Sequence, residues 1–433
     1  MKVIVAGHEG RGIQPHGTWT LAVAVLALYL LGLGAQSGGG TGGSPVASLS
    51  SSSQPSRPPT LAEARPGPAD GSASPWSLAS HAATPGSGES AGAVPPGFDP
   101  SGVWFINPDE GWVIGEAPCG DAKCTVVART RDGGRRWETT GAPATAGASQ
   151  QARSTDYVRA IRFADEHHGW AFYPELWATH DGGASWRQVR LGNPILSLET
   201  TAGRVYAVVG SCPGSMGECT GPVRLYEAEV GSDDWRSVLE VELKPGHSSN
   251  WVHHNGGLEV NDEAVYLMVE PNASGPEDGE PPLLFTRSPA GRWERRQNAP
   301  CDWGGGLTAR GPRNLVFLCQ TGEGAFNQAV YELYESSDGA RSWTLEWRSR
   351  GRVPHMAIVA DTTEARYVAW FTGELDVERR DGRRHTVWFN ASGQTEIFPS
   401  VRFVDPQHGT ALTSLVYITH DSDLTWEPIR FQP

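Results

Sequence analysis

Four similar octets hold the residues best suited to chemistry. They are "THDGGASW" at 179 to 186, "TRDGGRRW" ending at Trp137, "SSDGARSW" ending at Trp343 and "THDSDLTW" ending at Trp426. A carboxylate at a fixed place could serve as an acid, a base or a metal ligand. However, a reactive site is rarely built four times in one chain. The glycines supply the positive φ of a tight turn, and the Asp can accept N–H bonds from that turn. We therefore interpret the octets as structural.

Other polar residues give no catalytic motif. His167 and His168 in "DEHHGW" are predicted to be turn residues rather than metal ligands. Asp302 and Glu323 could approach one another, but acids on so acidic a chain are mostly surface residues. The sequence contains no Gly-x-Ser-x-Gly, His-Glu-x-x-His or phosphate-loop pattern. We predict no catalytic residue, no metal and no cofactor.

The octets belong to a longer repeat. Seven units of about 50 residues close at Trp137, Trp186, Trp235, Trp293, Trp343, Trp388 and Trp426. The second unit shows four short strands, at 161 to 165, 169 to 173, 175 to 180 and 185 to 189. Four antiparallel strands repeated seven times predict an all-β, seven-bladed β-propeller, with the evenly spaced indoles packed between neighbouring sheets. Its ring closes either within the last repeat, 401 to 431, or by pairing of a segment near Phe98 with the last blade.

The octets resemble a known repeat, the Asp-box or bacterial neuraminidase repeat of sialidase-like propellers, Ser/Thr-x-Asp-x-Gly-x-x-Trp. The structural positions implied are Asp132, Gly134, Trp137, Asp181, Gly183, Trp186, Asp338, Trp343, Asp421 and Trp426, with Asp423 standing where Gly is expected. The phrase from Phe163 to Trp170, looser from Phe105 to Trp112, resembles the photosystem II stability and assembly factor family of seven-bladed propellers. Both resemblances imply the fold, whereas function varies among such proteins.

The strand order predicts two different faces of the ring. The octets lie on one, the octet face, and the connections between second and third strands and between blades lie on the other, the loop face. Long loops on a rigid scaffold commonly carry binding. We predict that a rim of residues on the loop face contacts a ligand: Tyr157, Trp251, His253, His254, Asp302, Trp303, His355 and Phe398. The alternative is that these side chains only pack the mouth of the channel.

Six cysteines fall in local pairs, which predicts the disulfides Cys119-Cys124, Cys212-Cys219 and Cys301-Cys319 and an oxidising compartment. The amino terminus agrees with that location. Residues 1 to 17 are predicted to be a short cytoplasmic segment, 18 to 35 a transmembrane anchor, 36 to 98 a disordered Gly/Ser/Pro-rich linker and 99 to 433 the propeller. If residues 18 to 35 are instead a cleaved signal, the protein is secreted.

The charge balance limits the possible partners. A net charge of -14 and a pI near 5.4 argue against nucleic acid. The run Arg379, Arg380, Arg383 and Arg384 is predicted to be a solvated hairpin. We expect a non-catalytic, monomeric, membrane-tethered extracytoplasmic binding or assembly-factor propeller, with a glycan, peptide or envelope protein as partner. The alternative is a glycoside hydrolase of the sialidase kind, but the Arg-Ile-Pro signature of that class has only Arg352-Val353-Pro354 as a match, in the wrong repeat.

Overall fold

The computed structural model describes the propeller and a short amino-terminal strand. The described residues are 3–4, 92–145, 158–192, 194–201, 203–210, 218–219, 221–242, 248–250, 257–261, 264–269, 271–272, 282–288, 291–296, 303–321, 330–349, 357–370, 373–389 and 400–431. None of these segments forms a helix long and apolar enough to cross a membrane, and residues 18 to 35 lie outside them.

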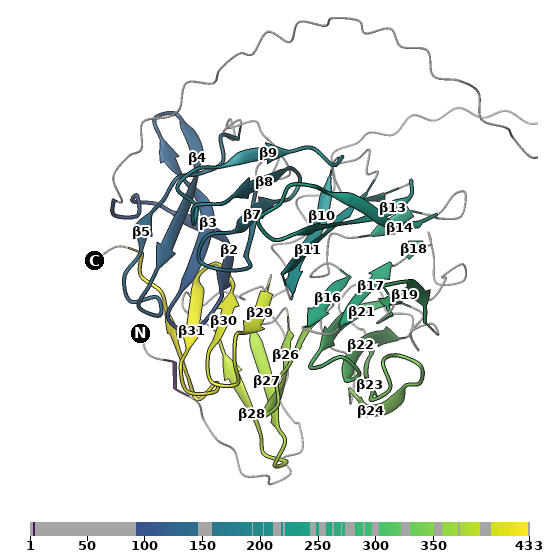
Figure 1. The fold of residues 1–433 in the computed structure, drawn as a ribbon. Helices are drawn as coiled ribbons and strands as arrows, with labels where there is room; N and C mark the ends of the chain where they lie inside the picture. Colours follow the sequence, from purple (N-terminus) through teal and green to yellow (C-terminus); the bar gives the residue numbers. More distant parts are fainter. Residues whose placement is uncertain are drawn as a thin grey trace, which may run out of the picture. The chain divides into compact units, whose positions relative to one another are not determined.

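Seven four-stranded antiparallel sheets form a ring, which confirms the predicted fold (Figure 1). Blade 1 comprises β2 (Asp99–Phe105), β3 (Gly111–Cys119), β4 (Ala122–Thr130) and β5 (Glu138–Thr139). Blade 2 comprises β6 (Ala160–Phe163), β7 (Gly169–Phe172), β8 (Leu176–Thr179) and β9 (Arg187–Val189). Blade 3 comprises β10 (Ile195–Thr201), β11 (Arg204–Val209), β13 (Val223–Glu229) and β14 (Arg236–Val241). In each blade the first strand is innermost.

The remaining blades repeat this order. Blade 4 comprises β16 (Leu258–Asn261), β17 (Ala264–Val269), β19 (Leu283–Arg287) and β20 (Trp293–Arg295). Blade 5 comprises β21 (Trp303–Ala309), β22 (Leu315–Thr321), β23 (Val330–Ser336) and β24 (Thr344–Arg348). Blade 6 comprises β25 (Ala357–Asp361), β26 (Ala365–Trp370), β27 (Glu374–Arg379) and β28 (Arg384–Trp388). Blade 7 comprises β29 (Ser400–Phe403), β30 (Gly409–Leu412), β31 (Val416–Thr419) and β32 (Thr425–Pro428).

The turn between the first two strands explains the Phe-x-Asp-x-x-x-Gly phrase. In blade 2 the Phe163 ring lies over Gly169, where an added Cβ would come within 2.4 Å of it. Asp165 Oδ1 accepts the backbone N–H groups of His167 and His168, both at 2.8 Å. The glycine therefore makes room for the ring, and the aspartate closes the turn.

All four octets share one hydrogen-bond pattern. In blade 2 the Thr179 hydroxyl donates to Asp181 Oδ1 at 2.8 Å and accepts the Gly183 N–H at 2.9 Å. Asp181 Oδ1 also accepts the Ser185 N–H at 2.8 Å. Burial opposes ionisation of Asp181, but the bonds from Ser185 and Thr179 hold its pKa below the usual range. The same contacts recur in the other three octets, from Thr130, Ser336 and Thr419. The octets are thus turns with their carboxylates already engaged.

Indole rings at the ends of the repeats fill the spaces between neighbouring blades. Trp137 packs with blade 7, and Trp426 packs with blade 6. Trp388 was expected to do the same, and this was wrong, because its side chain is 56% exposed on β28. The next residue, Phe389, is buried instead and lies 5.4 Å from the Trp426 ring. Period-2 alternation along the strand puts only one of two adjacent residues on the inner side.

The ring closes by packing between blades 7 and 1. Blade 7 takes all four of its strands from the last repeat, so the first predicted alternative is confirmed. The segment before β2 pairs instead with blade 1, through an antiparallel bridge between Ala93 and Glu138. The Phe98 and Phe431 rings meet edge to face at 4.9 Å and join the two ends.

A fifth strand, β1 (Val3–Ile4), pairs with β32 at the outer edge of blade 7. A segment at 18 to 35 that crosses a bilayer would hold residues 3 and 4 on the side opposite the propeller. The β1 pairing and the predicted anchor therefore exclude one another in a single molecule.

The loop face carries two further ordered features. A disulfide joins Cys119 to Cys124 across the β3–β4 hairpin, as predicted. Cys319 is also disulfide-bonded, but its predicted partner Cys301 lies outside the described residues. The predicted Cys212–Cys219 disulfide is not tested, because Cys212 also lies outside them. Three short strands, β12 (Glu218–Cys219), β15 (Ser248–Asn250) and β18 (Pro271–Asn272), form a separate sheet from the loops of blades 3 and 4.

Candidate binding site in the central channel

The innermost strands bring seven residues to one level of the channel. Pairing with the second strands sets this register, from Trp104 opposite Trp112 to Arg402 opposite Thr410. We call these residues the ring positions: Trp104, Arg162, Glu199, Glu259, Thr308, Ala360 and Arg402. Four of the seven carry ionisable side chains, although the strands are otherwise mostly apolar. Ionisable side chains inside a fold are stable only with polar or charged partners, so these four must have such partners in the channel.

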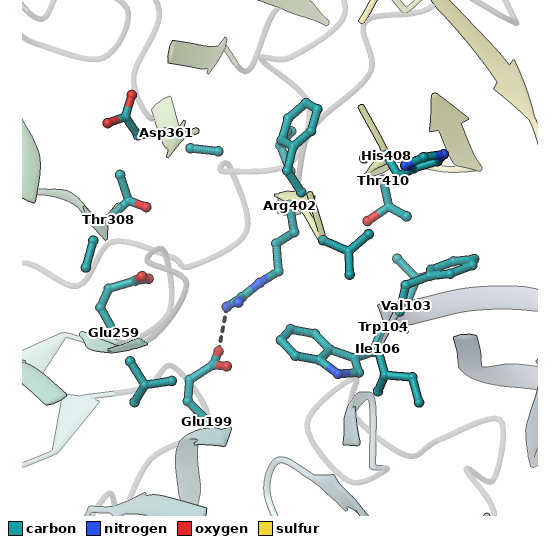
Figure 2. A pocket seen from close by; sticks show the side chains of 18 of the residues that line it. Val103, Trp104, Ile106, Glu199, Glu259, Thr308, Asp361, Arg402, His408 and Thr410 are labelled. Atoms are coloured by element: carbon teal, nitrogen blue, oxygen red, sulfur yellow. Dashed lines mark hydrogen bonds and ion pairs between the residues drawn. The ribbon is translucent and has the colours of Figure 1, made fainter. Parts of the chain in front are cut away.

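A buried ion-pair cluster, which we call the clamp, joins three blades. Glu199 Oε1 accepts from Arg162 Nε at 3.0 Å and Nη2 at 2.9 Å, and from Arg402 Nη2 at 2.5 Å. Glu199 is 3% exposed. Burial alone would raise its pKa, but the two guanidinium groups outweigh this and hold the pKa of Glu199 below its usual value. Because Glu199 belongs to blade 3 and Arg402 to blade 7, the clamp reaches across the channel (Figure 2).

Trp104 supports the clamp from blade 1. The guanidinium carbon of Arg162 lies 4.4 Å from the Trp104 ring centroid, and that of Arg402 lies 5.1 Å from it. The Trp104 indole N–H donates to the Phe163 carbonyl at 2.8 Å. An aromatic face stabilises a cation that has lost part of its water shell. The ring positions of blades 1, 2, 3 and 7 therefore form one packed polar unit.

A cavity of about 420 Å³ surrounds this level of the channel. Its wall includes Glu199, Glu259, Thr308 and Arg402, and it extends to Asp361 at the end of β25. Figure 2 shows these side chains around the cavity. The volume falls at the small end of the range for ligand pockets. The cavity could hold one side chain or a small polar group.

The other two cavity carboxyls differ in their partners. Asp361 lies between Arg310, 3.4 Å from Oδ2, and Arg380, which contacts Oδ1. Burial nevertheless raises the pKa of Asp361 to about 6. Within the part of the chain that is described, Glu259 forms no ion pair, and burial raises its pKa to about 8 despite the nearby charge of Arg402. Glu259 is therefore the one cavity acid that lacks a paired cation among the described residues.

At the octet face the cavity wall includes two histidines. His408 Nδ1 contacts Asp405 Oδ2 at 2.9 Å, and the His420 ring meets the His408 ring edge to face at 5.5 Å. Burial, with the nearby charge of His408, lowers the pKa of His420. Blade 2 repeats this geometry with His168 and His180. Among the described residues, no group of three or more His, Cys, Asp or Glu side chains could hold a metal.

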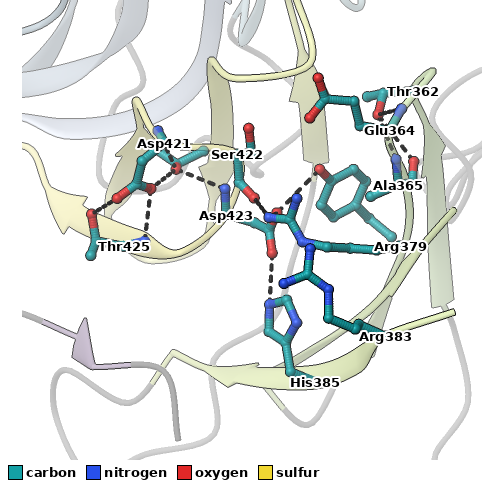
Figure 3. A network of polar contacts seen from close by, with 12 residues as sticks. Thr362, Glu364, Ala365, Arg379, Arg383, His385, Asp421, Ser422, Asp423 and Thr425 are labelled. Carbon is teal, nitrogen blue, oxygen red and sulfur yellow. Dashed lines mark hydrogen bonds and ion pairs between the residues drawn. The ribbon is translucent and has the colours of Figure 1, made fainter. Parts of the chain in front are cut away.

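The basic run on β27 and β28 differs partly from expectation. It does form a hairpin, and Arg383 and Arg384 are exposed. Arg379, however, binds the buried carboxylate of Asp423 in blade 7 at 2.7 Å (Figure 3). Arg380 contacts the buried carboxylate of Asp361. The expectation that all four arginines are solvated was therefore wrong for these two, because each faces a buried acid of a neighbouring strand or blade.

The structure does not test the predicted rim on the loop face. Tyr157, Trp251, His253, His254, Asp302, His355 and Phe398 lie outside the described residues, as does Glu323. Trp303 begins β21, where only its backbone is described. Sequence reasoning missed the clamp and Glu259. The available signal was a charged residue inside an apolar inner strand, as in "IRF", "VRF", "SLET" and "GLEV".

No family model and no curated protein matches the chain. Among solved structures it is similar to "YCF48 bound to D1 peptide", with 16% identity and a TM-score of 0.48, over 78% of this chain and 95% of that one. It is also similar to a GH74 enzyme of Niastella koreensis, with 12% identity and a TM-score of 0.40, over 76% of this chain and 59% of that one. A third is PorZ of Porphyromonas gingivalis, a component of the type-IX secretion system, with 9% identity and a TM-score of 0.43, over 78% and 38%. These neighbours include enzymes and non-enzymes alike.

Proposed function

We propose that the chain is a non-catalytic binding or assembly-factor propeller that recognises a peptide, a glycan or an envelope protein. The observation that carries the proposal is the clamp. Glu199 is bound by two arginines and is almost inaccessible, so this acid of the channel serves to join blades 2, 3 and 7. A channel whose charges are used to hold the scaffold together suits recognition better than turnover.

A glycoside hydrolase is the second candidate, and one observation favours it. Glu199 and Glu259 occupy neighbouring ring positions, and their pKa values are displaced in opposite directions, which is typical of a base and acid pair. Against it, a substrate could reach Glu199 only if Arg402 moved away. Both guanidinium groups also stabilise the carboxylate and so reduce its strength as a base or nucleophile.

The loop face is the proposed docking surface. The Cys119–Cys124 hairpin and the small sheet of β12, β15 and β18 give that face ordered structure. Rigid projections lower the conformational entropy lost on binding. We propose that the predicted rim, including His254 and Trp303, contributes contacts there. The octet-face turns, whose carboxylates are engaged, support a structural role for the proposed Asp-box repeats.

We further propose that the propeller lies outside the cytoplasm, tethered by residues 18 to 35, and that β1 is released from β32 in the tethered chain, since the two arrangements exclude one another. The Cys119–Cys124 disulfide supports an oxidising compartment. Protease accessibility of the propeller in cells whose outer envelope has been removed, with the cytoplasmic membrane intact, tests the location. Degradation of the propeller only after the cytoplasmic membrane is broken would contradict it.

Two assays test the function. A panel of chromogenic glycosides should show no turnover that depends on Glu199 or Glu259, and turnover lost in Glu259→Gln would replace the binder proposal with the hydrolase. Pull-down with the intact chain should recover a partner, and His254→Ala or Trp303→Ala should weaken its binding. Unchanged partner binding in both variants would refute the rim while leaving the binder proposal in place.

A further inference from the structure

We propose that the channel cavity is a binding site for a cationic side chain, lysine or arginine, of a partner polypeptide, with Glu259 as the acceptor. The inference rests on the proposed function, because it names the chemistry that the partner must present. It concerns the cavity, whereas the docking surface of the proposed function is the loop face.

The charges on the cavity wall lead to this assignment. Three carboxyl side chains contribute to the wall, those of Glu199, Glu259 and Asp361. Glu199 is held by two arginines, and Asp361 is held by Arg310 and Arg380. Among the described residues Glu259 has no such partner. Glu259 is half-buried in the cavity wall, where ionisation is costly unless a cation joins the carboxyl, so the cavity can accept one positive charge beside Glu259.

The surroundings of Glu259 favour a cation over other ligands. An anion would have to compete with Glu199 for Arg402, and their contact is short at 2.5 Å. A purely apolar group would leave the polar wall, including Thr308 and Thr410, without hydrogen bonds. A lysine ammonium or an arginine guanidinium can donate both to the Glu259 carboxylate and to the Thr308 hydroxyl. Figure 2 shows Glu259 and Thr308 on the same side of the cavity.

Binding of a cation should release a proton. The titratable and charged groups of the cavity are Glu199, Arg402, Asp361, His408 and His420, with Arg162 behind Glu199. At neutral pH Glu259 is mostly protonated, because burial raises its pKa to about 8. A bound ammonium would favour the carboxylate, so the proton would leave as the ligand enters. This predicts tighter binding as the pH rises through 8.

The test uses three probes with the full chain in isothermal titration calorimetry. They are acetylated pentapeptide amides with two glycines on each side of lysine, arginine or norleucine. We expect the lysine or the arginine peptide to bind at least tenfold more tightly than the norleucine peptide. Titration in two buffers of different ionisation enthalpy at pH 7 should report release of most of one proton per peptide, because the pKa of free Glu259 lies above 7.

Matched variants localise the effect. Glu259→Gln should remove the preference for a cation, whereas Glu259→Asp should keep it. Glu364→Gln, which changes an exposed glutamate of the blade 6 turn, should bind as the natural chain does. Equal affinity for norleucine, binding unchanged in Glu259→Gln, or no binding of either cationic peptide at 10 mM (about 3 kcal/mol) would each overturn the cation site. If Glu259→Gln does not fold, loss of the preference in Glu259→Asp would overturn it too.

The outcomes separate this inference from the proposed function. If a partner recovered by pull-down binds Glu259→Gln as tightly as the natural chain, the cation site is refuted and the proposed binding function stands. Glycoside turnover would refute the binder, whatever the calorimetry shows.

Discussion

Asp423 should stabilise the junction of blades 6 and 7 although its backbone is strained. It stands where the octets of blades 1 and 2 have Gly134 and Gly183, and its φ of 80° lies in the left-handed region that favours glycine. Its side chain is 0% exposed. The carboxylate lies 2.7 Å from Arg379 Nη2 and 2.6 Å from His385 Nε2 (Figure 3). We therefore expect the ion pair with Arg379 to outweigh the strain.

The magnitude for Asp423→Gly follows from three effects. Relief of the left-handed conformation would stabilise the fold by about 1 kcal/mol. The greater freedom of glycine in the unfolded chain would cost about 0.5–1 kcal/mol. Removal of the acid leaves Arg379 without its buried counter-charge, which costs about 3–5 kcal/mol. We expect a net loss of about 2.5–5 kcal/mol.

Differential scanning calorimetry of the full chain measures this loss. With an unfolding entropy of about 2.1 cal/mol/K per residue over roughly 335 propeller residues, 1 kcal/mol corresponds to about 1.4 °C, so the Tm should fall by about 4–7 °C. Ala340→Gly is the matched control, because Ala340 holds the same octet position in blade 5 with a φ of 61°. The control should shift the Tm by about 1 °C or less. Equal shifts in the two variants would refute the reasoning.

Three other perturbations test the core and the channel. Folding raises the pKa of Glu259 from 4.5 to about 8, so between these pH values the folded chain holds a proton that the unfolded chain releases. Stability should therefore fall as the pH rises from about 4.5 to 8. A series of Tm measurements across this pH range should show a smaller fall for Glu259→Gln than for the natural chain. Trp426→Ala should cost about 3–5 kcal/mol in calorimetry, whereas Trp388→Ala, at an exposed site, should cost under about 1 kcal/mol. Glu199→Gln leaves two arginines without their buried acid and should destabilise by about 3 kcal/mol; a Tm equal to that of the natural chain would contradict the clamp.

Local sequence patterns were sufficient to predict the fold. The strands predicted at 161 to 165 and 169 to 173 correspond to β6 and β7, because period-2 alternation and flanking turn residues act over a few positions. The disulfide between Cys119 and Cys124 was also predictable, since the two residues lie five positions apart on one hairpin. Such features need no knowledge of distant segments.

The candidate site depends on contacts that the local pattern does not contain. Glu199 and Arg402 are 203 positions apart, and only the closed ring brings them together. The same holds for Arg379 and Asp423, which belong to different blades. The sequence marked Asp423 as a departure from the repeat, but not which cations it would meet. The Trp388 expectation failed because an evenly spaced indole does not reveal which of two adjacent residues faces inward.

The ring positions are where the repeats can differ without loss of the fold. In blades 2 and 7 the phenylalanine after the ring position covers the glycine that begins the second strand, so Phe163 and Phe403 are required for packing. The preceding residues, Arg162 and Arg402, belong to the clamp and take no part in the packing of the phenylalanine on the glycine. Blade 1 keeps the phenylalanine but has Trp104 at the ring position. Since the scaffold fixes the neighbours and leaves this position open, each blade can contribute a different chemical group to the channel, and the channel can carry a specific polar site.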